Sequence, residues 1–343
     1  MSLTLKEQEI LAKIHVGSEN DPAQPEYPPY APMFPATTTT RLHVPGFTNL
    51  WIKNENENLT GTHKDRMAWE IIVTYRNLLI SKQRGVLEYL PAMSIISSGS
   101  AAVAIQNLLS AYELPALRVL VDFRLDPRIY QSLKKTGCLI YQTDLSTKPL
   151  SSTEILELTD NQQGFDITSS DALDPSTRFY DWLSYEILNN NPEYCFIPFG
   201  TGHLYENILN VAKKEVLGRS HDPRFSGSIE IVRNCNFYGA TTNNAQSKAN
   251  KLYSPHLPFA RFDQQWIRTY RAAGFCGVKS DVHLVEEVFI DQALSLAQVQ
   301  GIQGEASGLA GLALLLQFQD LIPKNSKIVI VNTGKTKLVD YDE

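Results

Sequence analysis

Cysteine is scarce in this 343-residue chain, which has four cysteines and no close pair with metal-ligand spacing. Long apolar runs are also missing, and none approaches the ~20 residues that a helix needs to cross a bilayer. The first residues lack a basic segment followed by an apolar one, so no secretory signal is expected. These absences favour a cytoplasmic protein with free thiols, no bound metal and no membrane partner.

Positive charge is in short supply as well, since 31 lysines and arginines face 37 aspartates and glutamates, for a formal net charge of -6. This balance argues against a broad electrostatic grip on nucleic acid. The chain also has neither a Walker A loop nor a Gly-x-Gly-x-x-Gly fingerprint, and so gives little reason to expect ATP or NAD. Its 43% hydrophobic fraction is ample for buried cores.

Short apolar runs alternate with helix-like segments along most of the chain. Strands are predicted at 50–53, 94–96, 118–123, 139–142, 194–198, 229–232, 285–290 and 327–331. Helices are predicted at 67–80, 101–112, 127–135, 178–188, 204–216 and 308–319, the polar segment 238–263 is predicted to form loops, and Asp291 is predicted to cap a helix. Such alternation implies parallel βαβ units with right-handed crossovers.

The predicted fold class is therefore α/β, with two domains built on parallel-rich twisted sheets flanked by helices. A polar stretch at 144–170 has few periodic apolar positions and suggests a boundary. The smaller domain is predicted to span 58–165. The larger one is predicted to combine 1–57, which includes a proline-rich arm at 15–35, with 166–343.

One lysine, Lys64, lies within residues 60–66 at the point where a loop becomes a helix. A lysine amine forms a Schiff base with an aldehyde only when it is unprotonated, and a helix N-terminus disfavours a cation. On the local residues alone, a solvated lysine beside Asp65 is the simpler interpretation. The importance of Lys64 therefore depends on whether more distant segments of the chain supply the partners that a Schiff-base lysine needs.

Two later loops each join a predicted strand to a predicted helix. The first comprises Ser97, Ser98, Gly99, Ser100 and Ala101, and the second comprises Gly200, Thr201, Gly202, His203 and Leu204. Hydroxyls and helix-end amides suit the first loop to a carboxylate, and glycine-rich backbone at a helix N-terminus suits the second to an anion. Taken singly, a Ser/Gly N-cap is the simpler interpretation of the first loop, and a glycine-rich turn is the simpler interpretation of the second.

Together, these segments resemble the fold type II pyridoxal phosphate (PLP) enzymes, the tryptophan synthase β-subunit superfamily. Residues 53–66 are most similar to the Lys-x-Glu…Pro-Thr-Gly-Ser-x-Lys-Asp-Arg pattern of threonine synthase, with Leu59 in the place of proline. The resemblance runs from about residue 51 to 337. It implies PLP as cofactor, a homodimer, and Lys64 as both the Schiff-base lysine and the later proton-transfer base.

The same resemblance assigns the other site residues. Residues 200–204 match the family's phosphate loop, residues 305–313 match its Glu-Pro-Ser-Gly-Ala-Ala stretch near the cofactor ring, and Thr333 falls against the pyridine nitrogen. A neutral hydroxyl there leaves the nitrogen largely unprotonated, which favours elimination or replacement over transamination. The implied cofactor-binding residues are Lys64, Ser100, Gly200, Thr201, Gly202, His203, Leu204, Glu305 and Thr333, and the implied substrate-binding residues are Ser97, Ser98, Gly99, Ser100 and Ala101.

Ser100 departs from the family pattern, which has an asparagine that contacts the 3-hydroxyl oxygen of the cofactor. The first hypothesis is a PLP-dependent lyase or synthase, similar to threonine synthase, that carries out β- or γ-elimination or replacement on an amino acid. The second, motivated by Ser100, is a PLP-binding pseudoenzyme or regulatory protein with little turnover. A third is a nucleotide-binding or structural α/β protein without PLP.

Overall fold

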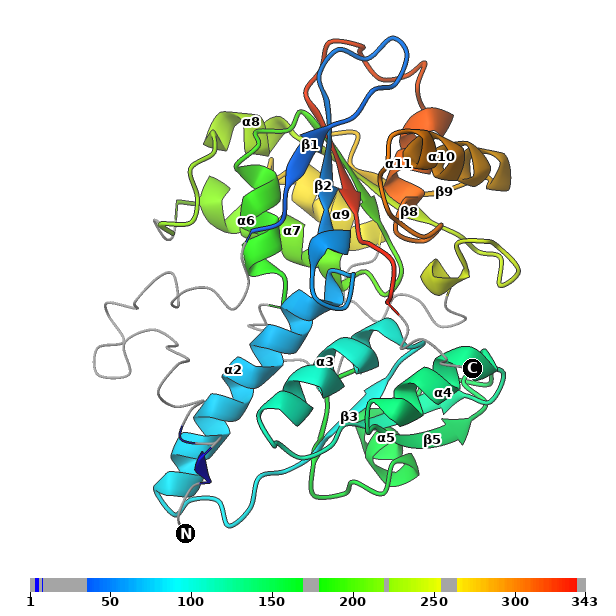
Figure 1. The fold of residues 1–343 in the computed structure, drawn as a ribbon. Coiled ribbons are helices and arrows are strands. Elements are labelled where there is room, and N and C mark those ends of the chain that lie inside the picture. Colours follow the sequence, from blue (N-terminus) through cyan, green and yellow to red (C-terminus); the bar gives the residue numbers. More distant parts are fainter. Residues whose placement is uncertain are drawn as a thin grey trace. The chain divides into compact units, whose positions relative to one another are not determined.

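The computed structural model describes residues 36–168, 179–218, 222–253 and 264–337, together with Thr4, Leu5 and Gln8. The predicted arm at 15–35 lies outside these residues. The chain forms two compact units (Figure 1), one containing Lys64–Phe179 and the other Pro35–His63 and Tyr180–Thr336. Residues 58–165, the smaller domain predicted from the sequence, fall mainly in the first unit, and residues 58–63 fall in the second.

The first unit contains a parallel sheet with helices packed around it. Its described strands have the order β5-β4-β3-β6, and every neighbouring pair is parallel. The strands are β3 (Met93–Ile96), β4 (Arg118–Asp122), β5 (Leu139–Thr143) and β6 (Phe165–Asp166). The helices are α2 (Lys64–Gln83), α3 (Ser100–Ala111), α4 (Pro127–Lys135) and α5 (Ser152–Leu158).

The second unit contains a larger sheet, whose described strands have the order β1-β2-β10-β7-β8-β9. All neighbours are parallel except β1 and β2. The strands are β1 (Thr39–Arg41), β2 (Leu50–Asn54), β7 (Tyr194–Pro198), β8 (Asn236–Thr241), β9 (Asp281–Leu284) and β10 (Ile328–Asn332). The helices are η1 (Glu55–Glu57), α6 (Asp181–Leu188), α7 (His203–Val216), α8 (Ile229–Asn234), η2 (Asn250–Leu252), α9 (Gln264–Ala272), α10 (Glu287–Val299) and α11 (Ala310–Gln317).

The core of the second unit lies against the central strands of its sheet. Strands β7 and β10 are buried along their whole length, which is why their sequences are continuous apolar runs. Helices α10 and α11 cover one side of the sheet, and α6 and α7 lie on the other side in Figure 1. The prediction of parallel α/β architecture is confirmed, and so are the predicted helices and the predicted strands other than those at 229–232 and 285–290.

These two predicted strands are wrong. Residues 229–232 form helix α8, because the Ser228 side chain accepts a hydrogen bond from the backbone of Ile231 and caps the helix. Residues 285–290 span the start of α10, and Asp291 lies inside that helix rather than capping it. Within residues 229–232 only Val232 is buried, whereas Ile229 is 45% exposed. The short β-branched run therefore forms a half-exposed helix and not the buried strand that its sequence predicts.

Other elements were missed where the sequence is polar. The stretch at 144–170 contains α5 and β6, and a capping box of Ser151 and Glu154 marks the start of α5. That Ser-x-x-Glu spacing was a readable signal. The segment at 238–263, predicted as loops, begins inside strand β8 and includes η2, and its residues 254–263 lie outside the described part of the chain.

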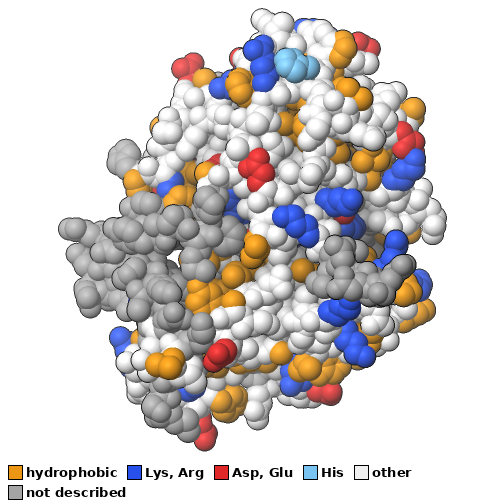
Figure 2. Space-filling model, in the orientation of Figure 1, with side chains coloured by type: hydrophobic (Ala, Val, Ile, Leu, Met, Phe, Trp, Pro, Cys, Tyr) orange, Lys and Arg blue, Asp and Glu red, His pale blue; other side chains and the backbone are white. Residues whose placement is uncertain are grey.

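The surface and the cysteines agree with the composition. On the face shown in Figure 2, lysine and arginine side chains form separate small groups rather than one continuous basic surface. All four cysteines are buried and free, so the prediction of free thiols is confirmed. Within the described ranges, no group of three or more His, Cys, Asp or Glu side chains is arranged to hold a metal ion.

No helix in the described parts of the chain has both the length and the apolar character needed to cross a membrane.

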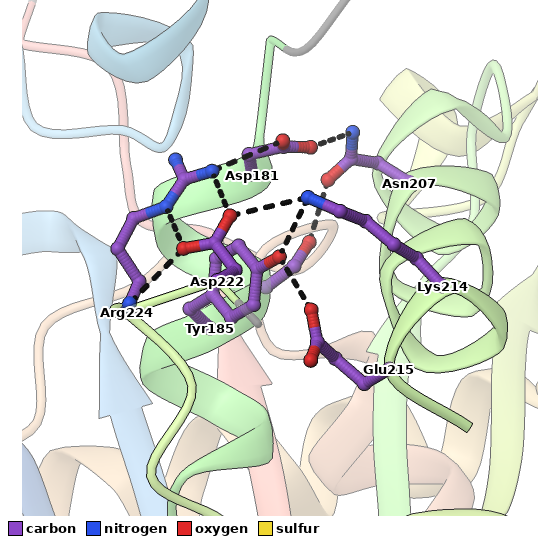
Figure 3. A network of polar contacts seen from close by, with 8 residues as sticks. Asp181, Tyr185, Asn207, Lys214, Glu215, Asp222 and Arg224 are labelled. Carbon is purple, nitrogen blue, oxygen red and sulfur yellow. Dashed lines mark hydrogen bonds and ion pairs between the residues drawn. The ribbon is translucent and has the colours of Figure 1, made fainter. Parts of the chain in front are cut away.

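A buried polar network ties helices α6 and α7 to the segment around residue 222 (Figure 3). The Arg224 guanidinium donates two hydrogen bonds of 2.9 and 2.7 Å to the Asp222 carboxylate, and Lys214 of α7 donates a third at 3.1 Å. Burial alone raises the pKa of Asp222, but these donors hold that pKa well below its ordinary value. On α6, the Tyr185 hydroxyl donates to Glu215 at 2.9 Å.

The same network reaches the first turns of α6 and α7. Asn207 of α7 donates to Asp181 at 3.1 Å and accepts from Ser184 at 2.6 Å. Asp181 also lies 3.6 Å from the Arg224 guanidinium. Since α7 begins directly after residues 200–202, this network holds the helix that follows the glycine-rich loop.

We predict that Asp222→Asn lowers the free energy of unfolding by about 3 kcal/mol at pH 7, because the buried Arg224 side chain loses its hydrogen-bonded counter-charge and keeps only the more distant Asp181. The pKa of Asp222 is depressed in the fold, so its contribution is present above the ordinary carboxyl pKa of 3.8 and is lost as the pH falls below that value. Urea denaturation across this pH range measures both effects.

Asp126→Asn is the matched control, since Asp126 holds Arg128 with the same Asp-x-Arg hydrogen bonds on the surface. It is expected to leave stability unchanged. Equal losses in the two variants would contradict the role assigned to burial.

Candidate active site

Lys64 is the first residue of α2, which confirms the predicted loop-to-helix junction. Its side chain is partly buried, and the following Asp65 and Arg66 are buried. A solvated surface turn would expose these charges. The segment is therefore part of the folded interior, as a functional lysine requires.

The residues before Lys64 are held along the end of strand β10. The His63 backbone N–H donates to the Thr333 carbonyl at 3.2 Å, and the Lys335 N–H donates to the Gly61 carbonyl at 2.9 Å. Between them, Thr62 and Gly334 form an antiparallel bridge. Lys64 thus follows, by one peptide bond, a residue hydrogen-bonded to Thr333.

Two buried polar residues, Glu55 and Asn58, hold the loop that leads to Lys64. In the sequence they appear only as members of the motif at 53–66. The Asn58 amide donates to the Glu55 carboxylate at 2.8 Å and to the Thr62 carbonyl at 3.1 Å. Glu55 also accepts a 2.5 Å hydrogen bond from the Thr37 hydroxyl. A charged side chain with no exposure is retained only when it is hydrogen-bonded. Glu55 and Asn58 therefore position the segment that leads to Lys64.

The glycine-rich loop lies between β7 and α7, as predicted. Gly202 has a left-handed φ of 87°, which favours glycine, and Leu204 is buried in the first turn of the helix. A Cβ at Gly200 would lie 3.3 Å from the Lys251 carbonyl oxygen, so η2 closes tightly against the loop. The Thr201 hydroxyl lies 3.3 Å from Nδ1 of His203. The first amides of α7 have no intrahelical acceptor and suit a phosphate.

Thr333 and Glu305, predicted neighbours of a cofactor ring, are brought together at the end of β10. The Thr333 N–H donates to Gly308 and the Glu305 N–H donates to Gly334, each at 3.2 Å. Thr333 is buried, and its hydroxyl makes no hydrogen bond within the described residues. A neutral hydroxyl directly after a strand end fits the ring nitrogen of PLP.

The strand order brings the loop before Lys64, Thr333 and the glycine-rich loop to the same end of the larger sheet, which we call its carboxyl edge. Strands β2, β10 and β7 are adjacent and parallel, so their carboxyl ends lie side by side. The loop leading to Lys64 follows β2, Thr333 follows β10, and residues 200–204 follow β7. Crevices outside the carboxyl ends of parallel strands are the usual binding positions in α/β sheets. The donor set there fits a phosphorylated pyridine aldehyde.

An ion pair that the sequence did not reveal lies beside this edge. The Lys251 ammonium donates to both Glu305 oxygens, at 2.6 and 2.8 Å, and lies 3.5 Å from the Thr336 hydroxyl. Because the backbone of Lys251 abuts Gly200, Glu305 is linked to the glycine-rich loop. No local signal could have found this pair, since 54 residues separate its members.

The serine-rich loop belongs to the first unit, where it joins β3 to α3. Gly99 precedes α3 with a φ of 130°, and Ser97 Oγ accepts hydrogen bonds from the N–H groups of Gly99 at 3.1 Å and Ala102 at 3.4 Å. Ser97 therefore caps the helix, and its hydroxyl proton stays available to a carboxylate. Ser98 is exposed, Ser100 is partly buried and Ala101 is buried.

Within each unit the structure brings predicted site residues together. The second unit gathers residues 200–204, Glu305 and Thr333 at one sheet edge, and the first contains the loop at 97–101 and Lys64 itself.

Comparison with known proteins identifies the class. The family described as "Pyridoxal-phosphate dependent enzyme" matches residues 32–334. The chain belongs to this family of PLP-dependent enzymes, and its cofactor is pyridoxal 5'-phosphate. A search of curated proteins found no match.

Several solved structures share the fold. One is a hydrogen sulfide-producing enzyme from Fusobacterium nucleatum, with 15% identity, a TM-score of 0.59 and coverage of 98% of both chains. Another is an O-acetylserine dependent cystathionine beta-synthase from Helicobacter pylori, with 12% identity, a TM-score of 0.60 and coverage of 98% of this chain and 96% of that one. A fungal L-serine ammonia-lyase from Rhizomucor miehei has 16% identity, a TM-score of 0.61 and coverage of 89% and 95%. These likenesses show the fold type II architecture.

We predict that Gly334→Ala disrupts the segment before Lys64. A Cβ at Gly334 would lie 2.1 Å from the Gly61 carbonyl oxygen, and the φ of 95° already disfavours a side chain. Gly274→Ala is the matched control, because Gly274 has a φ of 69° and its Cβ would meet no atom within 4 Å. The Gly334 variant should lose about 1–3 kcal/mol more in urea denaturation than the control, because of the clash.

PLP content, measured on the purified proteins, should fall in the Gly334 variant and stay at the wild-type level in the Gly274 variant. A Gly334 variant as stable and as rich in PLP as the control would show that the contact with Gly61 is unimportant.

Proposed function

We propose that this protein is a lyase or synthase acting on an amino acid with a leaving group at Cβ or Cγ, by elimination or replacement. The position of Thr333, a buried neutral residue directly after β10, is the observation that carries this proposal. A neutral partner leaves the pyridine nitrogen largely unprotonated, which disfavours transamination. The names of the fold neighbours, among them a serine ammonia-lyase and an O-acetylserine dependent synthase, agree with this reaction class.

Each group of residues takes one task in the proposed reaction. Bound PLP supplies an electron sink for charge developing at the substrate Cα. The Lys64 amine holds the cofactor aldehyde and later moves the Cα proton. The Ser97 hydroxyl and the helix-end amides at 98–101 hold the substrate carboxylate, and residues 200–204 hold the cofactor phosphate. Glu305, paired with Lys251, contributes a fixed carboxylate near Thr333.

The closest label for the chemistry is that of threonine synthase, on the strength of residues 53–66. We propose a cytoplasmic location because the cysteines are free thiols, and a homodimer from the same resemblance. Ser100 favours a second candidate, a PLP-binding protein with little turnover and a regulatory role. Its side chain is shorter than the asparagine usual at this position.

Lys64→Ala tests the proposed covalent attachment. Borohydride reduction followed by peptide mass spectrometry should place PLP on the peptide containing Lys64 in the wild type, and on no peptide in the variant, because the reacting amine is gone. Turnover should fall by about 10²–10⁴-fold with the loss of the proton-transfer base.

Lys82→Ala, at the other end of α2, is the control and should keep the label on Lys64. PLP attached instead to Lys251 or Lys335 would refute the assignment.

Ser100→Asn separates the two candidates. Wild-type and variant proteins are assayed with serine, O-acetylserine and O-phosphohomoserine for release of ammonia, acetate or phosphate. The lyase proposal predicts wild-type turnover with at least one substrate, and a rise of about fivefold in the variant if asparagine restores one hydrogen bond.

Ser226→Asn, an exposed serine in the other unit, should change nothing. PLP bound at Lys64 with no turnover of any substrate in the wild type would favour the regulatory candidate.

A further inference from the structure

A cavity of about 510 Å³ lies in the second unit beside the segment that carries Glu305. Its aliphatic lining includes Leu294 of α10, Ile302 and Leu309. Its polar lining includes Gln298, Gln303 and Lys335. Small-molecule sites in proteins span about 300–1,000 Å³ and combine apolar walls with a few polar groups, and this cavity has both properties.

The charge of this cavity selects the kind of ligand. Lys335, an exposed residue, is its one charged lining residue, and within the described parts of the chain the Lys335 ammonium makes no ion pair or hydrogen bond. Lys251, by contrast, is paired with Glu305. An anion placed beside Lys335 would gain a charge-assisted contact, and an aliphatic tail would cover the partly buried Leu294 and Ile302.

We propose that this cavity binds an aliphatic carboxylate, with the carboxylate at Lys335 and the hydrocarbon chain against α10. The two glutamine amides at the rim supply further donors to the carboxylate. Residues 97–101 are not among its lining residues. It does not depend on the reaction proposed above.

The cavity wall is hydrogen-bonded to the strand end that carries Thr333. The Asn332 amide donates to the Gln303 carbonyl at 2.8 Å, and Asn332 Oδ1 accepts from the Gly334 N–H at 3.0 Å. Lys335 lies two residues after Thr333. A carboxylate that orders Gln303 and Lys335 therefore also stabilises the strand end at the cofactor ring. By linkage, bound carboxylate and PLP strengthen each other's binding.

The test uses the PLP-loaded protein with octanoate as the probe, and calorimetry as the measurement. Wild-type protein should bind octanoate with a Kd of about 1 mM or tighter. Lys335→Met keeps the aliphatic stem but removes the charge, and should weaken binding at least about tenfold. Leu294→Gln, which places a polar group against the tail, should also weaken it while Lys335 remains in place.

Three controls make the result specific. Lys279→Met removes an exposed lysine outside the cavity and should leave octanoate binding unchanged. Hexylamine, which has the opposite charge, should not bind. Octanoate should also slow the loss of PLP during dialysis of the wild type and not of Lys335→Met.

The proposal is overturned if wild-type protein does not bind octanoate, or if Lys335→Met binds it as tightly as Lys279→Met does. It is also overturned if Ser97→Ala, rather than Lys335→Met, abolishes binding, because the carboxylate would then occupy the loop at 97–101. These outcomes leave the PLP content and turnover of Lys64 variants unaffected and so are separate from the test of the proposed reaction.

Discussion

The end of strand β10 is the constraint on which the rest of the site depends. Its backbone bonds on one side to the segment that leads to Lys64 and on the other to the segment that carries Glu305. Gly334 lies between them, with no room for a Cβ. Close approach of three backbones needs glycine at the crossing point, because any side chain would break the hydrogen bonds that hold all three.

Parallel pairing turns this local arrangement into a candidate cofactor site. Because β2, β10 and β7 run in the same direction, loops far apart in the sequence emerge at one edge of the sheet. One loop ends in a helix N-terminus that suits a phosphate, one presents a neutral hydroxyl, and one continues into the helix that begins with Lys64. The network around Asp222 ties helix α7, through Lys214, to the segment that carries Asp222 and Arg224.

Local patterns predicted much of the fold because long apolar strands and capped helices are specified by nearby residues. Strand β7 and helix α4 were predicted with the bounds that the structure has. The errors fell at residues 229–232 and 285–290, short apolar runs whose period fits either element. Tertiary contacts decided which element these runs form. Val288 is 54% exposed and Ile290 is buried. Residues two apart would share one face of a strand, so this difference in exposure indicates a helix packed on a core.

The sequence by itself indicated the class of chemistry, because the order and spacing of a lysine at a helix start, a serine-rich loop, a glycine-rich loop and a neutral strand-end residue together resemble a family pattern that none of them shows alone. Which residues meet was decided only by the tertiary structure. His63 reaches Thr333 across 270 residues, and Lys251 reaches Glu305 across 54. Such pairs depend on the order of the strands in the sheet and on how the loops after the strands pack together. Neither produces a periodic or compositional pattern along the chain.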